Sequence, residues 1–356
     1  MKLDPQLVST KWDEHQNKYH GRNPGLFWWQ AGPEITRHQN KLISGNVEKD
    51  WLQYSLEKYY KNRLPMENCL SLGCGTGHIE RKLAQLGAFA HCDAVDISSK
   101  SIEIAQQEAK KLKINTINYT VNDINKMDFE ENSYDAVWIN SAMHHFSNLE
   151  NICENVHKCL RPDGYIFLNE YIGPNRFQFP ERQKEIINLC LNLLPAQYRT
   201  KVLDHSDKED EKVPNLRTYK WYFQRILDKW KDRQLINTFR KKYKSFWEVK
   251  LGKPFIKSTV EFPSKRDVIS NDPSEAIRSE EIIDVLSQYF AIVEKKDWGG
   301  NIIQFLLADI AGNFNEDDLF SQALLRMILN METTLIQHGE LISDFAYIAA
   351  SPLIRT

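Results

Sequence analysis

The 356-residue sequence lacks the patterns on which several classes of protein depend. Its six cysteines form no C-x-x-C pair, which disfavours a disulfide framework and a cysteine-based zinc site, so we expect reduced cysteines packed in the interior. It has no GK[ST] phosphate loop, no internal repeat and no apolar run of membrane-spanning length. The N-terminus, Met-Lys-Leu-Asp-Pro, has no apolar signal core. These absences predict a cytoplasmic globular protein that does not bind a membrane.

The composition predicts a chain with a sizeable core. Hydrophobic residues make up 42% of the sequence and charged residues 26%, and the net charge is −2 at pH 7. A chain of this length holds one large domain with additions, or two domains. The sequence pI of about 6.6 is far from that of a typical nucleic-acid-binding protein, which makes nucleic acid an unlikely partner.

The most informative segment is CLSLGCGTGHIE, which runs from Cys69 to Glu80. Three glycines at alternate positions follow the apolar run Leu70-Ser71-Leu72, a pattern that predicts a buried strand, a tight turn and a helix. Glycine tolerates a positive φ and, having no side chain, lets a ligand lie against the backbone. Taken alone, this loop could equally be a plain turn.

Acidic and polar side chains follow the strands that we expect next. Asp96 ends an expected strand over 91–97, nineteen residues after Gly77, near the separation at which such folds place a carboxylate on a ribose diol. Asp123 follows a short β-branched and aromatic run, and a strand over 134–140 leads into Ser141. Asp96 could instead be a helix N-cap and Asp123 a turn residue. Polar residues at three successive strand ends favour a binding site.

These motifs together resemble the class I S-adenosylmethionine-dependent methyltransferases. The resemblance covers roughly Glu67 to Tyr171, including the turn LRPDG and a fifth strand over 165–170. It implies an α/β, Rossmann-like fold with a mainly parallel sheet of about seven strands. The absence of a C-x-x-x-C-x-x-C cluster disfavours a radical use of S-adenosylmethionine.

The resemblance also implies roles for individual residues. In that family the first strand-end acid binds the ribose, the second contacts the adenine amine, and the glycine loop accommodates the methionine part. By motif match these roles fall to Asp96, Asp123 and residues 73–77. The residues expected to contact S-adenosylmethionine, or its product S-adenosylhomocysteine, are Gly73, Cys74, Gly75, Gly77, Asp96, Ile97, Asp123, Ile124, Asn140 and Ser141.

A minimal methyltransferase domain is shorter than this chain, so the additions should carry specificity. We expect a helical N-terminal cover over 1–65, a cofactor-binding core over 66–173, a helical insertion acting as an acceptor lid over 174–275, the remainder of the core sheet over 276–314, and a C-terminal helix over 315–356. Within these segments the pattern predicts helices over 180–194 and 317–339, and strands near 289–294 and over 302–307. Phe27-Trp28-Trp29 either cover the site or anchor the N-terminal segment to the core.

The insertion is rich in basic and aromatic residues. From Lys212 to Lys257 there are 14 Lys and Arg against 3 Asp and Glu. Such a surface can hold phosphates and stack on sugars or bases, which suits an anionic or phosphorylated acceptor. The alternative is a pair of amphipathic helices with solvated lysines and inward-facing aromatic side chains. The oligomeric state is left open.

Three phrases are similar to a bacterial subgroup that is often associated with surface polysaccharide or secondary-metabolite pathways. They are EYIGPNRFQFP over 170–180, NDPSEAIRS over 271–279 and IAGNF over 310–314. Arg278, in the second phrase, either contacts an anionic acceptor or caps a neighbouring helix.

Methyl transfer from S-adenosylmethionine requires few catalytic side chains. The sulfonium already activates its methyl group, so transfer is an in-line displacement governed by positioning and exclusion of water. A hydroxyl acceptor needs a base within hydrogen-bond reach, and the candidates are His145, His144 and Glu170. In many relatives the corresponding histidine packs beside the cofactor without taking a proton. The histidine pair is not expected to bind a metal, since no carboxylate set at ligand spacing accompanies it.

We therefore expect an S-adenosylmethionine-dependent methyltransferase that acts on a small molecule or on a glycan or nucleotide-linked precursor, at oxygen. The alternatives are transfer to nitrogen or sulfur of a metabolite, and a non-catalytic regulator that binds S-adenosylmethionine.

Overall fold

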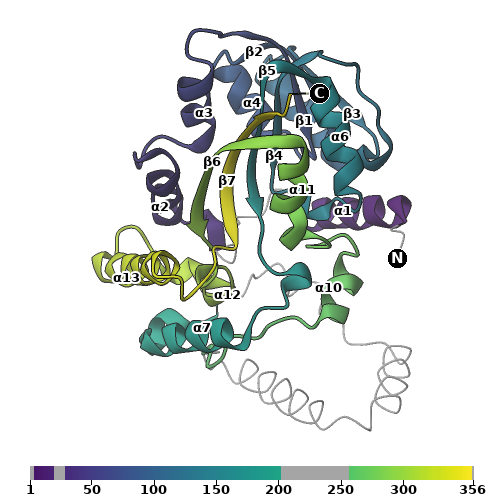
Figure 1. Ribbon diagram of the computed structural model, residues 1–356. Coiled ribbons are helices and arrows are strands. Elements are labelled where there is room, and N and C mark those ends of the chain that lie inside the picture. The colour runs from purple at the N-terminus through teal and green to yellow at the C-terminus, as the bar shows by residue number, and fades with distance from the viewer. Residues whose placement is uncertain (1–3, 20–28, 202–255, 355–356) are drawn as a thin grey trace, which may run out of the picture.

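The computed structural model describes residues 4–19, 29–201 and 256–354. Its centre is a seven-stranded sheet in the order β3-β2-β1-β4-β5-β7-β6 (Figure 1). The strands are β1 (Met66–Leu72), β2 (Phe89–Asp96), β3 (Ile117–Val121), β4 (Tyr134–Asn140), β5 (Leu160–Tyr171), β6 (Phe290–Gly299) and β7 (Phe345–Pro352). Only β7 runs antiparallel to its neighbours within the described sheet, so the mainly parallel α/β fold predicted from the sequence is confirmed.

Helices cover both faces of the sheet. They are α1 (Pro5–Tyr19), α2 (Pro33–Ser44), α3 (Trp51–Tyr59), α4 (His78–Gln85), α5 (Ser99–Lys111), α6 (Leu149–Cys159), α7 (Glu181–Leu193), α10 (Lys265–Asn271), α11 (Ile282–Tyr289), α12 (Ile303–Leu307) and α13 (Leu319–Gln337). Figure 1 shows α7, α10, α12 and α13 gathered beyond one end of the sheet. The predicted helices over 180–194 and 317–339 correspond to α7 and α13.

The apolar runs of the central strands reflect burial on both faces. In β4, Val137 belongs to the hydrophobic cluster that includes residues of α6 and α11. Its neighbour Trp138 belongs to the opposite cluster, with residues of α2, α3, α4, α12 and α13. Because both faces are covered, the strand needs apolar residues at consecutive positions instead of alternate ones.

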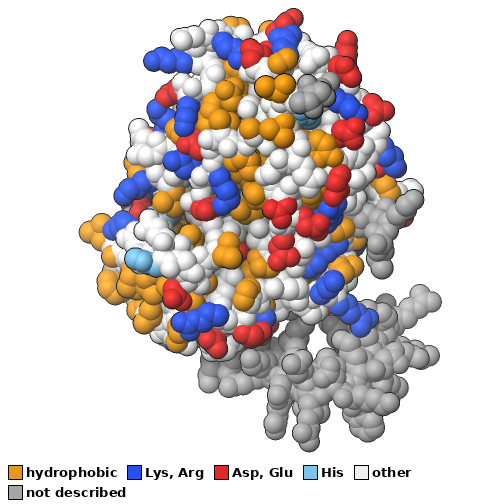
Figure 2. Space-filling model, in the orientation of Figure 1, with side chains coloured by type: hydrophobic (Ala, Val, Ile, Leu, Met, Phe, Trp, Pro, Cys, Tyr) orange, Lys and Arg blue, Asp and Glu red, His pale blue; other side chains and the backbone are white. Residues whose placement is uncertain are grey.

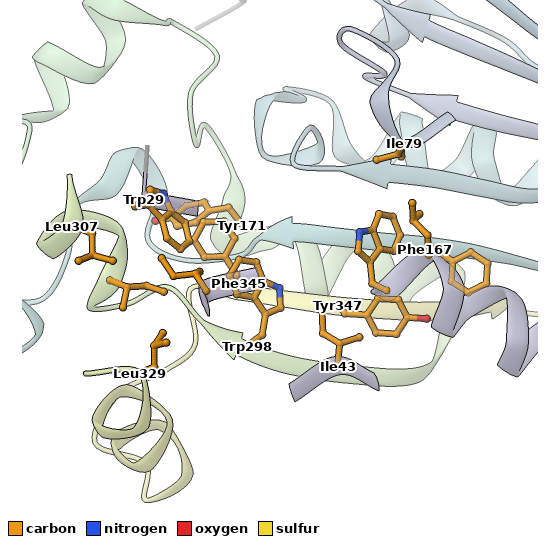
Figure 3. Packing of buried hydrophobic residues seen from close by; sticks show 14 of the residues in the cluster. Trp29, Ile43, Ile79, Phe167, Tyr171, Trp298, Leu307, Leu329, Phe345 and Tyr347 are labelled. Atoms are coloured by element: carbon orange, nitrogen blue, oxygen red, sulfur yellow. The ribbon is translucent and has the colours of Figure 1, made fainter. Parts of the chain in front are cut away.

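Trp29 anchors the N-terminal segment to the core and does not cover the cavity described below. Its ring stacks on Trp298 at a centroid distance of 6.2 Å and lies 5.4 Å from the ring of Phe345 (Figure 3). Trp29 is 4% exposed. The second of the two interpretations offered for this aromatic segment is therefore correct for Trp29, while residues 27 and 28 lie outside the described residues.

The strand predicted over 302–307 is wrong, because this segment forms the short helix α12. The backbone N–H and C=O groups at its two ends form hydrogen bonds with side chains from distant parts of the chain. The buried carboxylate of Glu332 accepts hydrogen bonds from the N–H groups of Gly300, Ile302 and Ile303. At the other end, the ammonium of Lys257 donates to the carbonyls of residues 305, 306 and 308. Long-range capping of this kind stabilises a helix too short to be stable by itself.

The last strand of the sheet lies inside the segment that we expected to be only a C-terminal helix. After α13, residues 345–352 turn back into the sheet as β7 and pair with both β5 and β6. The boundary placed at 314 for the end of the core sheet therefore omits one of its strands. Of the expected insertion over 174–275, residues 202–255 lie outside the described residues.

The cysteines and the surface charges are arranged as the composition predicts. All six cysteines are free and buried, as predicted. Figure 2 shows basic and acidic side chains interspersed over the face turned to the viewer. In the described part of the chain, none of the helices combines the length and the apolar character needed to cross a bilayer.

Two buried carboxyl groups make the stability of the fold depend on pH. Burial raises the pKa of Glu332 to about 7 and that of Asp344 to about 8. The folded chain therefore keeps protons that the unfolded chain loses above pH 4, so the free energy of unfolding should fall as pH rises from 5 to 8. For Asp344 this loss is roughly 2–4 kcal/mol.

The substitution Asp344→Asn tests this expectation, since it leaves a neutral side chain of the same shape. Urea unfolding at pH 5 and pH 8 should show a smaller loss of stability in this variant than in the parent protein. Asp317→Asn, at an exposed aspartate, should lose as much as the parent. Equal pH dependence in Asp344→Asn and the parent would contradict the raised pKa.

Candidate functional site

A cavity of about 290 Å³ lies at the carboxyl ends of the parallel strands, where open α/β sheets bind ligands. Four segments that follow strands β1 to β4 form most of its wall, and helix α1 forms the rest. The lining residues are Val8, Trp12, Gln16, Gly73, Cys74, Gly75, Thr76, His78, Ile79, Glu80, Asp96, Ile97, Ser101, Asp123, Ile124, Asn125, Asn140, Ser141, Ala142, His145 and Phe146.

Two glycines of the loop after β1 have different functions. Gly77 has a φ of +75°, and a Cβ there would lie 2.5 Å from the hydroxyl of Tyr119, so this position is fixed by packing. Gly75 has a φ of +53°, yet a Cβ there would meet nothing within 4 Å. Gly75 lines the cavity, so the open space beside it is available to a ligand that lies against the backbone.

Asp96 connects this loop to the end of β2. One carboxylate oxygen accepts a hydrogen bond from the N–H of Gly75, and the other accepts from the N–H of Ser98, both at 2.8 Å. Burial raises the pKa of Asp96, and these two backbone donors oppose the rise. Each carboxylate oxygen has a second lone pair, so Asp96 can still accept from two adjacent hydroxyl groups.

Asp123 presents a buried oxygen that receives no hydrogen bond and lies beside a lysine. Its Oδ1 accepts hydrogen bonds from the backbone and side-chain N–H groups of Asn125. Its Oδ2 is buried and has no hydrogen-bond partner among the described residues, although the ammonium of Lys126 lies 3.1 Å away. A buried acceptor left in this state is satisfied when a ligand N–H reaches it.

The end of β4 completes the floor of the cavity. The N–H of Ser141 donates to the carbonyl of Asn169 on β5, and Asn140 accepts from the Asn169 amide at 3.1 Å. Ser141 has a φ of +48°, a conformation that is uncommon for a residue with a side chain. Both residues line the cavity.

The structure brings together the residues proposed from the sequence as cofactor contacts. Nine of the ten line the cavity, and the tenth, Gly77, supports the loop from behind by its contact with Tyr119. Their contact with a cofactor stays a prediction.

The three candidate bases lie in different environments. Only His145 lines the cavity. Burial and the neighbouring His144 lower the pKa of His145 to about 3, so its imidazole is neutral at physiological pH. Burial alone would lower the pKa of His144, but the carboxylates of Glu170, Glu275 and Asp272 raise it.

Glu170 is fully buried and does not line the cavity. Its carboxylate accepts hydrogen bonds from the N–H groups of Ala142, Met143 and Tyr171, and it pairs with Nδ1 of His144. These contacts leave Glu170 out of reach of a substrate proton, so the sequence-based proposal of Glu170 as a base does not fit. Glu170 instead orients the His144 ring and the short helix Met143–His145.

Helix α1 lies within the expected N-terminal cover over 1–65, but the sequence analysis did not single out its residues as part of the site. Trp12 lines the cavity, and its ring meets His145 edge to face at 5.1 Å. Asp13 holds the helix in place, because its carboxylate accepts from the Ser98 hydroxyl at 2.6 Å and from the Lys100 N–H at 3.0 Å. The helix is polar for most of its length, so the only sequence signal was a tryptophan and an aspartate in one short segment.

A second residue that the sequence analysis did not single out is Glu80. This carboxyl lines the cavity, is fully buried and pairs with the Ser71 hydroxyl through Oε1. Its Oε2 has no hydrogen-bond partner among the described residues. Burial raises the pKa of Glu80 to about 7.

Comparison with known proteins places the segment that forms most of this cavity in a family. The family model described as a methyltransferase domain matches residues 70–168, the segment that contributes most of the cavity wall. Residues 70–168 form a class I S-adenosylmethionine-dependent methyltransferase domain. The cofactor of this class is S-adenosylmethionine, so the match confirms the resemblance derived from the motifs.

The relatives of this methyltransferase domain differ in their acceptors. The sterol 24-C-methyltransferase of Candida albicans is 24% identical over 201 residues, which are 49% of this chain and 53% of the relative. The malonyl-[acyl-carrier protein] O-methyltransferase of Bacillus cereus is 31% identical over 136 residues, with coverage of 37% of this chain and 48% of the relative. The chain spans about half the length of these curated relatives.

Among solved structures, the chain is similar to geranyl diphosphate C-methyltransferase from Streptomyces coelicolor. The sequence identity is 12% and the TM-score 0.44, with coverage of 98% of this chain and 97% of that chain.

The residues present fit S-adenosylmethionine. Asp96 offers two acceptors to a ribose diol, and the open space at Gly75 leaves room for the methionine part. Oδ2 of Asp123, which lies beside Lys126 and receives no hydrogen bond, suits the adenine amine. The cavity volume lies near the lower end of the range for ligand pockets.

Replacing the ribose-binding acid should weaken cofactor binding. In Asp96→Ala, the dissociation constant of S-adenosylhomocysteine measured by calorimetry should rise about 10- to 100-fold, because two charge-assisted hydrogen bonds are lost. Asp163→Ala, at an exposed position near the start of β5 and outside the cavity lining, serves as the control and should bind as the parent does. Undiminished affinity in a folded Asp96→Ala protein would contradict the ribose assignment.

Loosening α1 should also weaken binding. Asp13→Ala removes the hydrogen bonds that hold the helix against the start of α5, and we expect about 5- to 20-fold weaker binding of S-adenosylhomocysteine. Glu14→Ala changes the next residue, which is exposed, and should have no effect. If the two variants bind the ligand equally well, α1 does not form a wall of the cofactor site.

Proposed function

We propose that this protein transfers the methyl group of S-adenosylmethionine to an oxygen atom of a small molecule or of a glycan or nucleotide-linked precursor. The observation that carries the proposal is the cavity itself. In it a glycine loop, the two carboxylate oxygens of Asp96 and the buried carboxylate oxygen of Asp123 converge at the carboxyl ends of adjacent strands. A cytoplasmic location belongs to the same proposal.

The geometry suits a reaction that depends on positioning. The sulfonium of the bound cofactor supplies an activated methyl group, and the protein has to align an acceptor atom with it and exclude water. Helix α1 covers the cavity with Val8 and Trp12, which supports the exclusion of water.

His145 is the candidate for contact with the acceptor. Its ring lines the cavity between Trp12 and the end of β4. A hydroxyl acceptor needs a hydrogen-bond acceptor for its proton, and a neutral imidazole provides one. We therefore assign contact with the acceptor to His145, and positioning roles to His144 and Glu170.

Two basic residues near the insertion, Arg278 and Lys257, make structural contacts. Arg278 makes a bidentate ion pair with Glu150, at 2.6 and 2.7 Å, and also pairs with Glu281. These contacts fix the start of α6. Lys257 caps α12, and burial lowers its pKa to about 8. The prediction of an anionic acceptor came from the basic segment 212–257, of which residues 212–255 lie outside the described residues.

Two other functions remain as alternatives. Transfer to nitrogen or sulfur needs no base, so a full rate in a variant without His145 would favour it. A regulator would bind the cofactor without turning it over. The malonyl-[acyl-carrier protein] relative is named for transfer to oxygen and the sterol relative for transfer to carbon. The support for an oxygen acceptor therefore comes from His145 and not from the relatives.

Incubation of the protein with labelled S-adenosylmethionine and a bacterial metabolite extract tests the activity. We expect a labelled small product, and its mass and fragmentation identify the methylated atom. Binding of the cofactor without any labelled product across a broad set of extracts would favour the regulator.

The role of His145 is tested in the same assay. His145→Ala should lower the rate of methyl transfer about 10-fold, because the acceptor hydroxyl loses the hydrogen bond that aligns it, while the affinity for S-adenosylhomocysteine changes less than threefold. His91→Ala, at an exposed histidine on β2, is the control. A parallel loss of rate and cofactor affinity would indicate that His145 binds the cofactor.

A further inference from the structure

Two of the three distinctive phrases of the sequence meet beside the cofactor cavity. Glu170 comes from EYIGPNRFQFP, and Asp272, Ser274 and Glu275 come from NDPSEAIRS. Backbone hydrogen bonds hold the second phrase in place, since the N–H of Ile277 donates to the carbonyl of His144 at 3.0 Å. Both phrases therefore surround the histidine pair.

The contacts place carboxylates next to both histidines. Nε2 of His144 lies 3.5 Å from a carboxylate oxygen of Glu275. Nδ1 of His145 lies 3.5 Å from Asp272 and 3.1 Å from the Ser274 hydroxyl. No metal was expected at the histidine pair, because no carboxylate set at ligand spacing accompanies it in the sequence. The fold supplies a carboxylate, Glu275, from a loop far along the chain.

We propose that His144, His145 and Glu275 bind a divalent transition-metal ion such as Zn²⁺ at the edge of the cofactor cavity. One ligand atom from each of these side chains lies within 4.8 Å of the others, and within the described ranges this is the one set of three such residues. Two ligands on one zinc ion lie about 3.3 Å apart, so the 3.5 Å between His144 and Glu275 needs almost no adjustment.

The surroundings match those of known metal sites. A histidine ligand usually donates its second ring N–H to a carboxylate, which fixes the ring and makes the other nitrogen a better ligand. Glu170 pairs with Nδ1 of His144 and leaves Nε2 directed at Glu275. Ser274, whose hydroxyl donates to Asp272, contacts Nδ1 of His145 at 3.1 Å.

The donor set determines the kind of ion. Two imidazoles and one carboxylate suit zinc, iron, cobalt or nickel better than magnesium or calcium, which prefer oxygen ligands. Three protein ligands leave a coordination position for water or for an oxygen atom of an acceptor. His145 lines the cavity, so an ion on it would adjoin the bound cofactor. This site goes beyond the proposed methyl transfer. An ion bound to His145 would use the lone pair of its neutral imidazole, so in the metal-bound protein the ion and not the imidazole would contact the acceptor oxygen.

Metal binding itself is the test, and it needs no turnover. The full-length protein, with any affinity tag removed, is stripped with a chelator and titrated with Co²⁺, whose visible absorption reports coordination by nitrogen and oxygen. Zn²⁺ is measured in competition, and the metal content after dialysis against Zn²⁺ is measured by mass spectrometry. We expect one ion per chain.

Glu275→Gln is the decisive variant, because Glu275 is partly exposed and its loss should not unfold the chain. It should weaken Co²⁺ and Zn²⁺ binding about 100-fold, and His144→Ala should do the same. Glu280→Gln, at an exposed glutamate a few residues away, is the matched control and should bind as the parent does. Circular dichroism and thermal unfolding check that each variant is folded.

Three outcomes would overturn the site. They are the absence of Co²⁺ absorption at millimolar metal, equal affinity in folded Glu275→Gln and Glu280→Gln, and a bound ion that survives both Glu275→Gln and His144→Ala. Any of these would mean that the cluster is only a network of ion pairs. Each can be observed whether or not the protein transfers methyl groups.

Discussion

The carboxylate of Asp96 holds together the parts of this structure that meet at the cavity. It receives the N–H of Gly75 from the loop after β1 and the N–H of Ser98 at the start of α5. Ser98 in turn donates its hydroxyl to Asp13 on α1. A single chain of hydrogen bonds thus links the glycine loop, the second strand and the N-terminal helix. The shape of the cavity depends on all three segments.

The features predicted correctly were those with a local signal. Buried strands are apolar on both faces, and the residues that follow them meet at one edge of a parallel sheet, so Asp96, Asp123 and Asn140 could be placed from the sequence alone. The wrong predictions involve contacts between distant segments. Residues 302–307 are apolar in either a strand or a helix, and the caps that decide between these come from Lys257 and Glu332.

The same limit applies to the groups around the histidines. A sequence shows that Glu170 and Glu275 belong to distinctive phrases, but their common neighbour His144 emerges only when the loop after α10 folds back onto the end of β5. Sequence reasoning treated Glu170 as a free base, because burial and its four hydrogen-bond partners are tertiary properties.

The position of β7 has a consequence for how the chain is synthesised. This strand pairs on both edges, with β5 on one side and β6 on the other, although it follows both in the sequence. Until residues 345–352 leave the ribosome, β5 and β6 each present an unpaired edge with no strand between them. Exposed edges recruit other chains, so a chain in which β7 is missing or not yet paired should be prone to aggregate.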